Sequence, residues 1–441
     1  MPASAEALVE TMARANLVTR SAPTAPVYVC LDAGLQEAPL QAEPAWPDLA
    51  RFAPPEPPRP PRAAVEKAAA LLDGAERPLM LVGRGARTRE AWAARVALAE
   101  RLGACVVTDL KVGASFPSEH PAATLPPFNQ MPAAARELLC EADAILALDW
   151  VDLGGALKQA GSAGEVTARI VAASLDQHLH NGFNMDYLAL PPVDVAIAAS
   201  ADALTAELVE ALGQGQRQPW RERRPAKEAP DLGPDGPVDL RQVAAALWSA
   251  FPEPERVSLA AQSRGWPFDL WPLKDPLAYL GKDGGGGVGS GPGLSVGAAL
   301  ALHERGRLTV SVIGDGDFVM GVQALWTAVH HQIPLLVLVN NNRSYFNDEL
   351  HQESVARRRG REPRNRWIGQ RLADPELDLV KLAEAQGAVG IGPVRKAGEV
   401  EAALQRGVAV LQSGGVCVID LHVDSGEERT AQAIQARPAG Q

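Results

Sequence analysis

The stretch from Leu308 to Tyr345 constrains the fold most, because two apolar runs in it flank a helical pattern. The β-branched run Leu308–Ile313 ends at Gly314-Asp315-Gly316 and predicts a buried strand that stops at a tight turn. A second apolar run, Leu335–Val339, leads into three asparagines. Between the runs a helix is expected over Gly321–His331, closed by a proline, with apolar residues at helical spacing at Val322, Leu325, Trp326 and Val329. Strand, helix and strand in this length predict a right-handed βαβ unit.

Polar residues stand where both predicted strands end. In parallel sheets ligands bind beyond the carboxyl ends of the strands, so Asp315 and Asn342, 27 residues apart, should lie side by side. Mg²⁺ takes oxygen ligands, usually one or two carboxylates with phosphate oxygens and water. Glycines beside Asp315 would let the backbone approach a diphosphate. Gly-Asp-Gly alone is a common turn and Asn-Asn a common loop, but the pair on one βαβ unit favours a metal–diphosphate site.

This stretch resembles the thiamin-diphosphate-binding motif of 2-oxo acid decarboxylases and acetolactate synthases. The shared elements are Gly-Asp-Gly, the helical Leu325-Trp326-Thr327-Ala328, and Asn-Asn followed by Arg343-Ser344-Tyr345, which is closest to benzoylformate decarboxylase-like members. The resemblance implies that Asp315, Asn342 and the backbone carbonyl of Ser344 hold Mg²⁺, and that Gly316 and Asp317 contact the diphosphate. The cofactor site that it implies consists of Gly287, Val288, Gly289, Gly314, Asp315, Gly316, Asp317, Asn342, Ser344 and Tyr345.

The glycine-rich segment 283–293 supports this site. Glycines are costly in conformational entropy unless a backbone must approach something closely, and the helical pattern Leu294–Leu302 follows at once. A flexible linker is the alternative. In the family a Gly-(large apolar)-Gly element here holds the cofactor bent. Val288 has that place, flanked by Gly287 and Gly289, and is smaller than the usual residue.

The 441 residues are enough for two or three domains, and alternating helix and strand patterns predict an α/β chain. We expect two doubly wound parallel-sheet domains, a central one and a diphosphate-binding one, preceded by a remnant of a third. The expected division is 1–45 (remnant of a pyrimidine-binding domain), 46–62 (proline-rich linker), 63–213 (central domain), 214–237 (linker), 238–425 (thiamin-diphosphate and Mg²⁺ domain) and 426–441 (tail).

The first 45 residues predict a helix over Ala7–Thr19 and a strand over Val27–Leu31, too little for a domain. In the resembled family such a pair closes the pyrimidine-binding domain, which also supplies a glutamate that activates the cofactor across a dimer interface. Four glutamates precede the linker and none matches that context, so no catalytic residue is assigned. They are Glu6, Glu10, Glu37 and Glu43.

Two further patterns leave alternatives open. Gly83-Arg84-Gly85 follows a predicted strand and is either a phosphate-approaching loop or, more simply, a strand-to-helix turn. The family's central domain holds FAD in some members and nothing in others, and the sequence favours neither. The segment Phe346–Arg371 reads as irregular, and its six arginines within 357–366 either capture an anionic substrate or belong to a solvated loop.

The net charge of −11 argues against nucleic acid or an anionic membrane as a partner. Four scattered cysteines, no long apolar run and no signal-like N-terminus favour the cytoplasm. We therefore expect decarboxylation or carboligation of a small 2-oxo acid with thiamin diphosphate and Mg²⁺, in a homo-oligomer or with a partner that carries the pyrimidine-binding domain. The alternative is a non-catalytic cofactor-binding or regulatory subunit, or an inactive truncated product.

Overall fold

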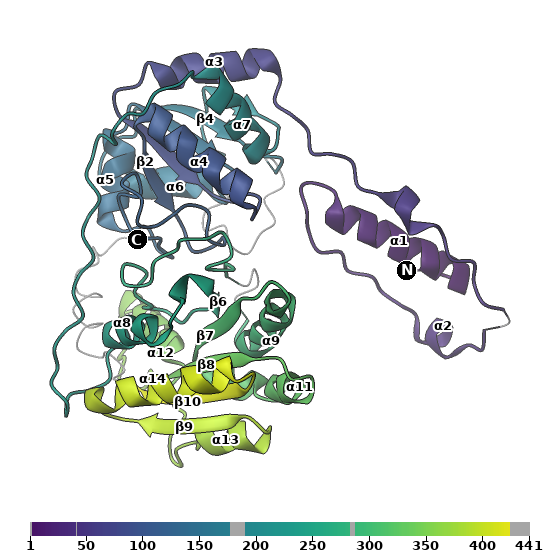
Figure 1. The fold of residues 1–441 in the computed structure, drawn as a ribbon, viewed down its shortest axis with the longest axis vertical. Helices are drawn as coiled ribbons and strands as arrows, with labels where there is room; N and C mark the ends of the chain where they lie inside the picture. The colour runs from purple at the N-terminus through teal and green to yellow at the C-terminus, as the bar shows by residue number, and fades with distance from the viewer. Residues whose placement is uncertain (1, 41, 177–189, 283–286, 424–441) are drawn as a thin grey trace.

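The computed structural model describes residues 2–40, 42–176, 190–282 and 287–423, so the expected tail 426–441 lies outside it. Two five-stranded sheets, in both of which all the paired strands are parallel, form the body of the protein. Figure 1 shows one sheet above the other, with the N-terminal segment beside them. This arrangement confirms the expected α/β class with two doubly wound parallel sheets.

The first sheet has the strand order β2-β1-β3-β4-β5. Its strands are β1 (Pro78–Val82), β2 (Cys105–Thr108), β3 (Ala144–Leu148), β4 (Arg169–Ala173) and β5 (Val195–Ile197). One face is covered by α3 (Arg62–Asp73), α4 (Arg89–Leu102) and α7 (Ala201–Ala211), and the other by α5 (Ala133–Glu141) and α6 (Leu153–Ala160).

The second sheet has the order β6-β7-β8-β10-β9. Its strands are β6 (Val257–Ala261), β7 (Leu308–Gly314), β8 (Leu335–Asn341), β9 (Val389–Val394) and β10 (Val416–His422). On one face lie α8 (Leu240–Ala250) and α14 (Ala397–Gln412), and on the other α9 (Ser290–His303), α10 (Asp315–Gly321), α11 (Ala324–His330) and α13 (Leu379–Ala385). Helix α12 (Phe346–Arg358) follows β8.

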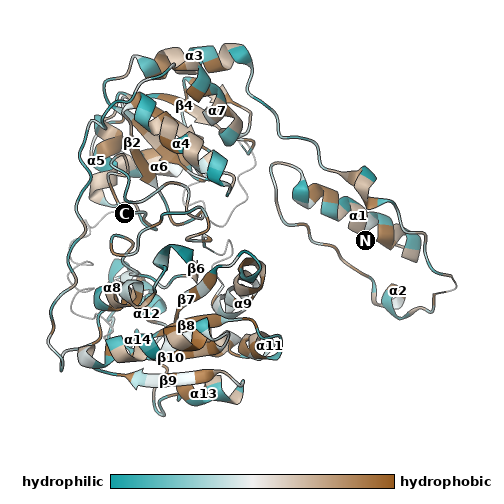
Figure 2. Cartoon of the chain, viewed as in Figure 1, coloured by the Kyte–Doolittle hydropathy of each residue, from teal (hydrophilic) through white to brown (hydrophobic). Residues whose placement is uncertain are grey.

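Continuous apolar runs make these strands, because a parallel strand is covered by helices on both faces. Every residue of β1 and β3 is buried, and so are all the apolar residues of β8. Figure 2 shows brown, apolar residues along β7 and β8 and teal, polar residues on the outer helices α3 and α4. The aromatic residues Trp266 and Trp271, which follow β6, are 5% and 1% exposed and belong to the core of the second sheet.

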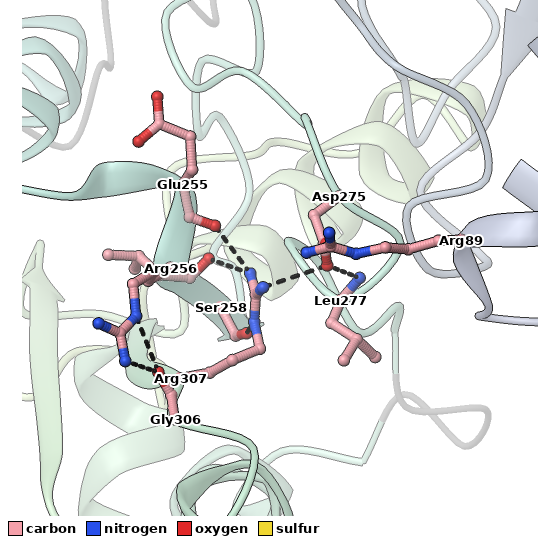
Figure 3. Close-up of polar contacts among 9 residues, drawn as sticks. Arg89, Glu255, Arg256, Ser258, Asp275, Leu277, Gly306 and Arg307 are labelled. Carbon is pink, nitrogen blue, oxygen red and sulfur yellow. Dashed lines mark hydrogen bonds and ion pairs between the residues drawn. The ribbon is translucent and has the colours of Figure 1, made fainter. Parts of the chain in front are cut away.

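A polar joint connects the two sheets through the segment after β6. Tyr279 donates its hydroxyl to Leu110 O at 3.0 Å, and its carbonyl accepts from Ala114 N at 2.8 Å. Figure 3 shows Asp275 between Arg307, which directly precedes β7, and Arg89 of α4; the ion-pair distances are 3.1 Å and 3.4 Å. The Arg307 side chain is 9% exposed, and burial lowers its pKa below the ordinary value, which Asp275 partly opposes.

The N-terminal segment differs from the expectation. The predicted helix is present as α1 (Ala5–Arg20), but the predicted strand over Val27–Leu31 is wrong: this stretch is extended coil that pairs with no strand. Asp32 instead caps the short helix α2 (Ala33–Glu37) by accepting from Leu35 N. A strand needs a neighbour for its backbone groups, and the described chain supplies none here. No helix of the described residues is long and apolar enough to cross a membrane.

Two other expectations need correction. The helix expected over Gly321–His331 is present as the shorter α11, and a separate helix, α10, begins directly at Asp315, where a tight turn was expected. Trp326, one of the apolar positions of the expected helix, is 55% exposed. The segment expected to be irregular begins with the 13-residue helix α12. Its inward face carries the buried carboxylates Glu349 and Glu353 instead of an apolar stripe. Sequence periodicity could not reveal such a helix.

Candidate active site

The predicted site residues meet at the carboxyl end of the second sheet. Strands β7 and β8 are neighbours, with Gly314 opposite Asn340, so Asp315 and Asn342 follow adjacent strand ends. One backbone group joins them: Ser344 N–H is 3.0 Å from Asp315 Oδ2 and 3.0 Å from Asn342 Oδ1. The two oxygens therefore lie no more than about 6 Å apart, as the geometry of two hydrogen bonds to one donor requires.

Asp315 is a buried carboxylate with no cationic partner. It is 3% exposed and accepts hydrogen bonds from the backbone N–H groups of Gly316 and Ser344, both at 3.0 Å. Burial raises its pKa from 3.8 to about 6, and these hydrogen bonds only partly offset the effect. None of the described lysines, arginines or histidines forms an ion pair with it, so a cation at this point would meet an uncompensated charge.

The donor set fits Mg²⁺. One carboxylate oxygen and one side-chain amide oxygen converge here, and the Ser344 peptide lies beside them. The remaining coordination positions of a Mg²⁺ ion would be filled by phosphate oxygens and water. Among the described residues no group of three or more His, Cys, Asp or Glu side chains could hold a metal by itself. A metal held here would therefore depend on the diphosphate for part of its coordination.

Close contacts explain two of the glycines of this site, Gly316 and Gly289. A Cβ at Gly316 would lie 2.2 Å from the ring of Tyr345, so the aromatic ring packs directly on the turn. Gly289 has φ of 98°, a backbone conformation that other residues rarely adopt, and a Cβ at this position would lie 3.0 Å from Met320. Val288 beside it is 48% exposed, and Gly287 has nothing near its Cβ position.

Asp317 contacts the backbone at the start of α9. Its Oδ1 accepts from the backbone N–H groups of Gly289 at 2.5 Å and Gly291 at 3.2 Å, so the carboxylate ties α10 to the start of α9. The carboxylate thus connects two segments that carry predicted cofactor-binding residues, and its diphosphate contact remains a prediction.

The two open alternatives can now be compared with the structure. A Cβ at Gly83 would lie 2.2 Å from Asp149 O, and Arg84 pairs with Asp149 and Asp176, so packing explains the Gly-x-Gly turn and we assign no nucleotide to it.

Of the arginines in 357–366, Arg357 and Arg366 pair with the buried Glu353. Their charges hold α12 and the following segment together, which weakens the anion-capture interpretation for these two.

Sequence reasoning missed the buried acids around the site. Ser344 Oγ donates to Glu349 Oε1 at 2.5 Å, and Asp420 accepts from Asn341 Nδ2 at 2.9 Å. Asp420 carried a signal in the sequence, since it is the one carboxylate among the apolar residues of strand β10. Glu6, Glu10, Glu37 and Glu43 are all exposed, and within the described chain none of them contacts Asp315 or Asn342.

Comparison with known proteins agrees with this geometry. Residues 260–421 match the family model of the thiamine pyrophosphate enzyme C-terminal TPP binding domain, and residues 65–168 match that of the thiamine pyrophosphate enzyme central domain. The chain belongs to the thiamine pyrophosphate enzyme family. Thiamine pyrophosphate is thiamin diphosphate, so the family confirms the cofactor class that the motif predicted.

Relatives within the family are distant. The chain is 27% identical over 391 residues to sulfoacetaldehyde acetyltransferase of Alcaligenes xylosoxydans xylosoxydans, covering 81% of this chain and 62% of the relative. It is 25% identical over 411 residues to a probable acetolactate synthase large subunit of Methanocaldococcus jannaschii, covering 87% and 64%. The chain thus spans a little under two thirds of these curated relatives.

Solved structures share the fold. The 4-hydroxybenzoylformate decarboxylase of Rhodococcus jostii aligns with a TM-score of 0.74 at 22% identity, covering 96% of this chain and 75% of that one. Benzoylformate decarboxylase from Polynucleobacter necessarius aligns with a TM-score of 0.73 at 20% identity, covering 96% and 75%. At these identities the likeness concerns the fold alone.

Proposed function

We propose that this chain binds thiamin diphosphate together with Mg²⁺ and takes part in decarboxylation or carboligation of a small 2-oxo acid. The observation that carries the proposal is the convergence of Asp315 Oδ2 and Asn342 Oδ1 on one N–H group, where the Asp315 carboxylate is buried and forms no ion pair with a described residue. Asp315, Asn342 and the carbonyl of Ser344 would hold the metal.

The remaining site residues would hold the organic part. Gly314 and Gly316 leave the turn free of side chains, and Tyr345 covers it. Segment 287–289, with Val288 exposed, would support the cofactor from the side of α9. Bound thiamin diphosphate supplies a nucleophilic carbon and an electron sink for cleaving or forming a bond next to a carbonyl. The chain contributes the charge, the orientation and a surface that excludes water.

We also propose that activity needs a pyrimidine-binding domain in trans, on a partner chain. One observation that supports this is the exposure of the four glutamates before the linker, none of which contacts the proposed metal-binding residues in the described part of the chain. Large apolar side chains also lie uncovered in the N-terminal segment, since Tyr28 is 90% and Trp46 71% exposed. Such residues favour burial against another surface.

The cofactor proposal can be tested by titration calorimetry. Asp315→Ala should weaken Mg²⁺-dependent binding of thiamin diphosphate by several kcal/mol, on the order of 100-fold or more, because it removes the carboxylate of the metal site. Asp231→Ala, a change at an exposed loop carboxylate, is the matched control and should bind like the wild type. Equal affinity of wild type and Asp315→Ala would overturn the assignment.

The activity proposal needs a second assay. The chain alone, saturated with cofactor and Mg²⁺, should decarboxylate pyruvate and benzoylformate very slowly, since general-base assistance is worth about 10²–10⁴-fold. Adding a pyrimidine-binding domain should restore turnover. Cofactor binding without turnover in any such mixture would favour the non-catalytic, regulatory alternative.

The domain division remains a proposal as well. We propose boundaries at 63–213 and 238–425, joined by exposed segments. Limited proteolysis should cut first within 54–62 and 213–237, where the structure has no α-helix or β-strand apart from the first residue of α3. Earlier cleavage inside 308–345 would contradict these boundaries.

A further inference from the structure

The loop between the two proposed metal-binding residues contains a strained residue. Arg343 stands between Asn342 and Ser344 and has φ of 59°, in the left-handed region that favours glycine. A non-glycine residue persists there only where its surroundings fix it. The contacts that fix Arg343 therefore also fix the peptide groups on either side of it.

Three contacts hold Arg343. Its N–H donates to Asn341 Oδ1 at 3.1 Å, its carbonyl accepts from Leu372 N at 2.8 Å, and its guanidinium lies 3.2 Å from His422 Nδ1. The first of these fixes φ of Arg343 most directly, because it involves the residue's own amide. It depends on the orientation of the Asn341 side-chain amide.

Asp420 sets that orientation from the neighbouring strand. Its Oδ1 accepts from Asn341 Nδ2 at 2.9 Å, so the amide oxygen of Asn341 must point toward Arg343 N–H. Asp420 Oδ2 lies 3.3 Å from His422 Nε2. Arginine can only donate, and the guanidinium groups of Arg343 and Arg395 both face His422 Nδ1, so the imidazole proton lies on Nε2 and points at Asp420.

We propose that Asp420 is a positioning residue for the metal loop, residues 341–344. Its carboxylate orients Asn341, Asn341 fixes the backbone of Arg343, and this backbone brings Asn342 Oδ1 and the Ser344 peptide to Asp315. The inference rests on the proposed metal–diphosphate function. Asp420 is 2% exposed, and both of its oxygens have partners, which leaves no freedom for a different role in the described structure.

The hydrogen-bond pattern defines a rescue. In Asp420→Asn, the introduced side chain has one oxygen acceptor where the carboxylate had two. Asn341 Nδ2 and His422 Nε2 both need an acceptor, so in either orientation of the new amide one of these donors faces its NH₂ group. If Asn341 turns to compensate, Arg343 N–H loses the side-chain oxygen of Asn341. In the double variant Asn341→Asp/Asp420→Asn every donor again faces an acceptor, and the net charge is unchanged.

Hydrogen exchange of the metal-free chain tests the inference without any ligand. The amides of Arg343 and Ser344 should exchange at least about 10-fold faster in Asp420→Asn than in the wild type, and the double variant should return to within about 3-fold. Asp143→Asn is the matched control, because Asp143 also accepts two hydrogen bonds, from Glu76 N and Arg77 N, in the other sheet. It should leave the exchange of the loop unchanged.

Calorimetry with Mg²⁺ and thiamin diphosphate then tests the link to function. Asp420→Asn should bind about 10-fold more weakly, and the double variant should recover. Unchanged loop exchange in Asp420→Asn, or a folded double variant that is not rescued, would overturn the positioning role. A wild type that binds no cofactor would overturn the proposed function instead. If Asp420→Asn fails to fold, the test is the amide exchange of Arg343 and Ser344 in the double variant. Exchange rates that match the wild type would support the positioning role, and faster exchange would overturn it.

Discussion

The buried carboxylate of Asp315 predicts an unusual dependence of stability on pH in the metal-free protein. Its pKa is raised from 3.8 to about 6, so between these pH values the folded chain holds a proton that the unfolded chain has released. The stabilising contribution of the neutral carboxyl is fully present below pH 3.8 and is lost as the pH rises through about 6. Near neutral pH the charged, desolvated carboxylate destabilises the fold.

The size of the effect follows from the shift. The difference between 3.8 and about 6 corresponds to about 3 kcal/mol at about 1.36 kcal/mol per pH unit, as an upper limit. Asp315→Asn removes this titration but leaves one of two backbone donors, Gly316 N or Ser344 N, without its acceptor, which costs about 1–3 kcal/mol at every pH. The absolute stabilities of the two proteins are therefore similar near pH 7, and the difference in slope identifies the carboxyl group.

Urea unfolding between pH 4.5 and 7.5 measures this slope. In EDTA, the free energy of unfolding of the wild type, relative to Asp315→Asn, should fall by about 2 kcal/mol between pH 4.5 and 7.5, because the unfolded carboxyl is already mostly ionised at pH 4.5. With Mg²⁺ and thiamin diphosphate at 100 times the dissociation constant, the wild type should gain about 2.7 kcal/mol near pH 7 and less at low pH, because a cation requires the ionised carboxylate. The variant should gain little at any pH.

Two results would refute this reasoning. A wild-type-minus-variant difference that stays flat between pH 4.5 and 7.5 in EDTA would show that Asp315 titrates normally and is not the desolvated group described here. Equal stabilisation of both proteins by Mg²⁺ and thiamin diphosphate would show that the ligands bind elsewhere.

Two matched pairs of variants test the packing around the site and the joint between the sheets. Gly316→Ala places a Cβ 2.2 Å from the neighbouring tyrosine ring and should lower the free energy of unfolding by about 1–3 kcal/mol, whereas Gly314→Ala, with nothing within 4 Å, should change it by less than about 0.5 kcal/mol in thermal unfolding. Asp275→Ala leaves the buried Arg307 without its carboxylate and should destabilise by about 3–5 kcal/mol, while Arg89→Ala removes an exposed partner and should cost about 1 kcal/mol or less in urea unfolding. Equal effects within either pair would contradict the described contacts.

The sequence predicted the elements whose pattern is local. Buried parallel strands such as β1 and β8 are short apolar runs bounded by polar turns, and the βαβ unit that joins β7 to β8 brings Asp315 to Asn342 without any knowledge of distant strands. One continuous stretch of sequence was therefore enough to predict that Asp315 and Asn342 lie close together. Edge strand β9, which contains glycine and proline, lacks such a run and was missed.

Elements that depend on distant partners were not predictable. The stretch 27–31 has a strand-like composition but meets no strand, and α12 has a polar composition but packs through buried carboxylates. Its Glu353 is buried, which would raise its pKa, but hydrogen bonds from Arg357 and Arg366 lower the pKa overall. Arg366 lies 13 residues further along the chain, so helical periodicity cannot report this stabilisation.

The strand order explains why the second layer of the site escaped prediction. In the sequence β10 is the last strand, yet it inserts between β8 and β9, with Asp420 opposite Val339 and His422 opposite Asn341. The carboxyl edge of the sheet therefore collects groups from β7, β8 and β10, and those from β10 come from 79 residues beyond Asn341. A change in the pairing of β10 with β8 by one residue would turn Asp420 to the opposite face, because side chains alternate along a strand. The geometry of the metal loop thus depends on a register that is set by the apolar residues of the sheet core, far from any motif.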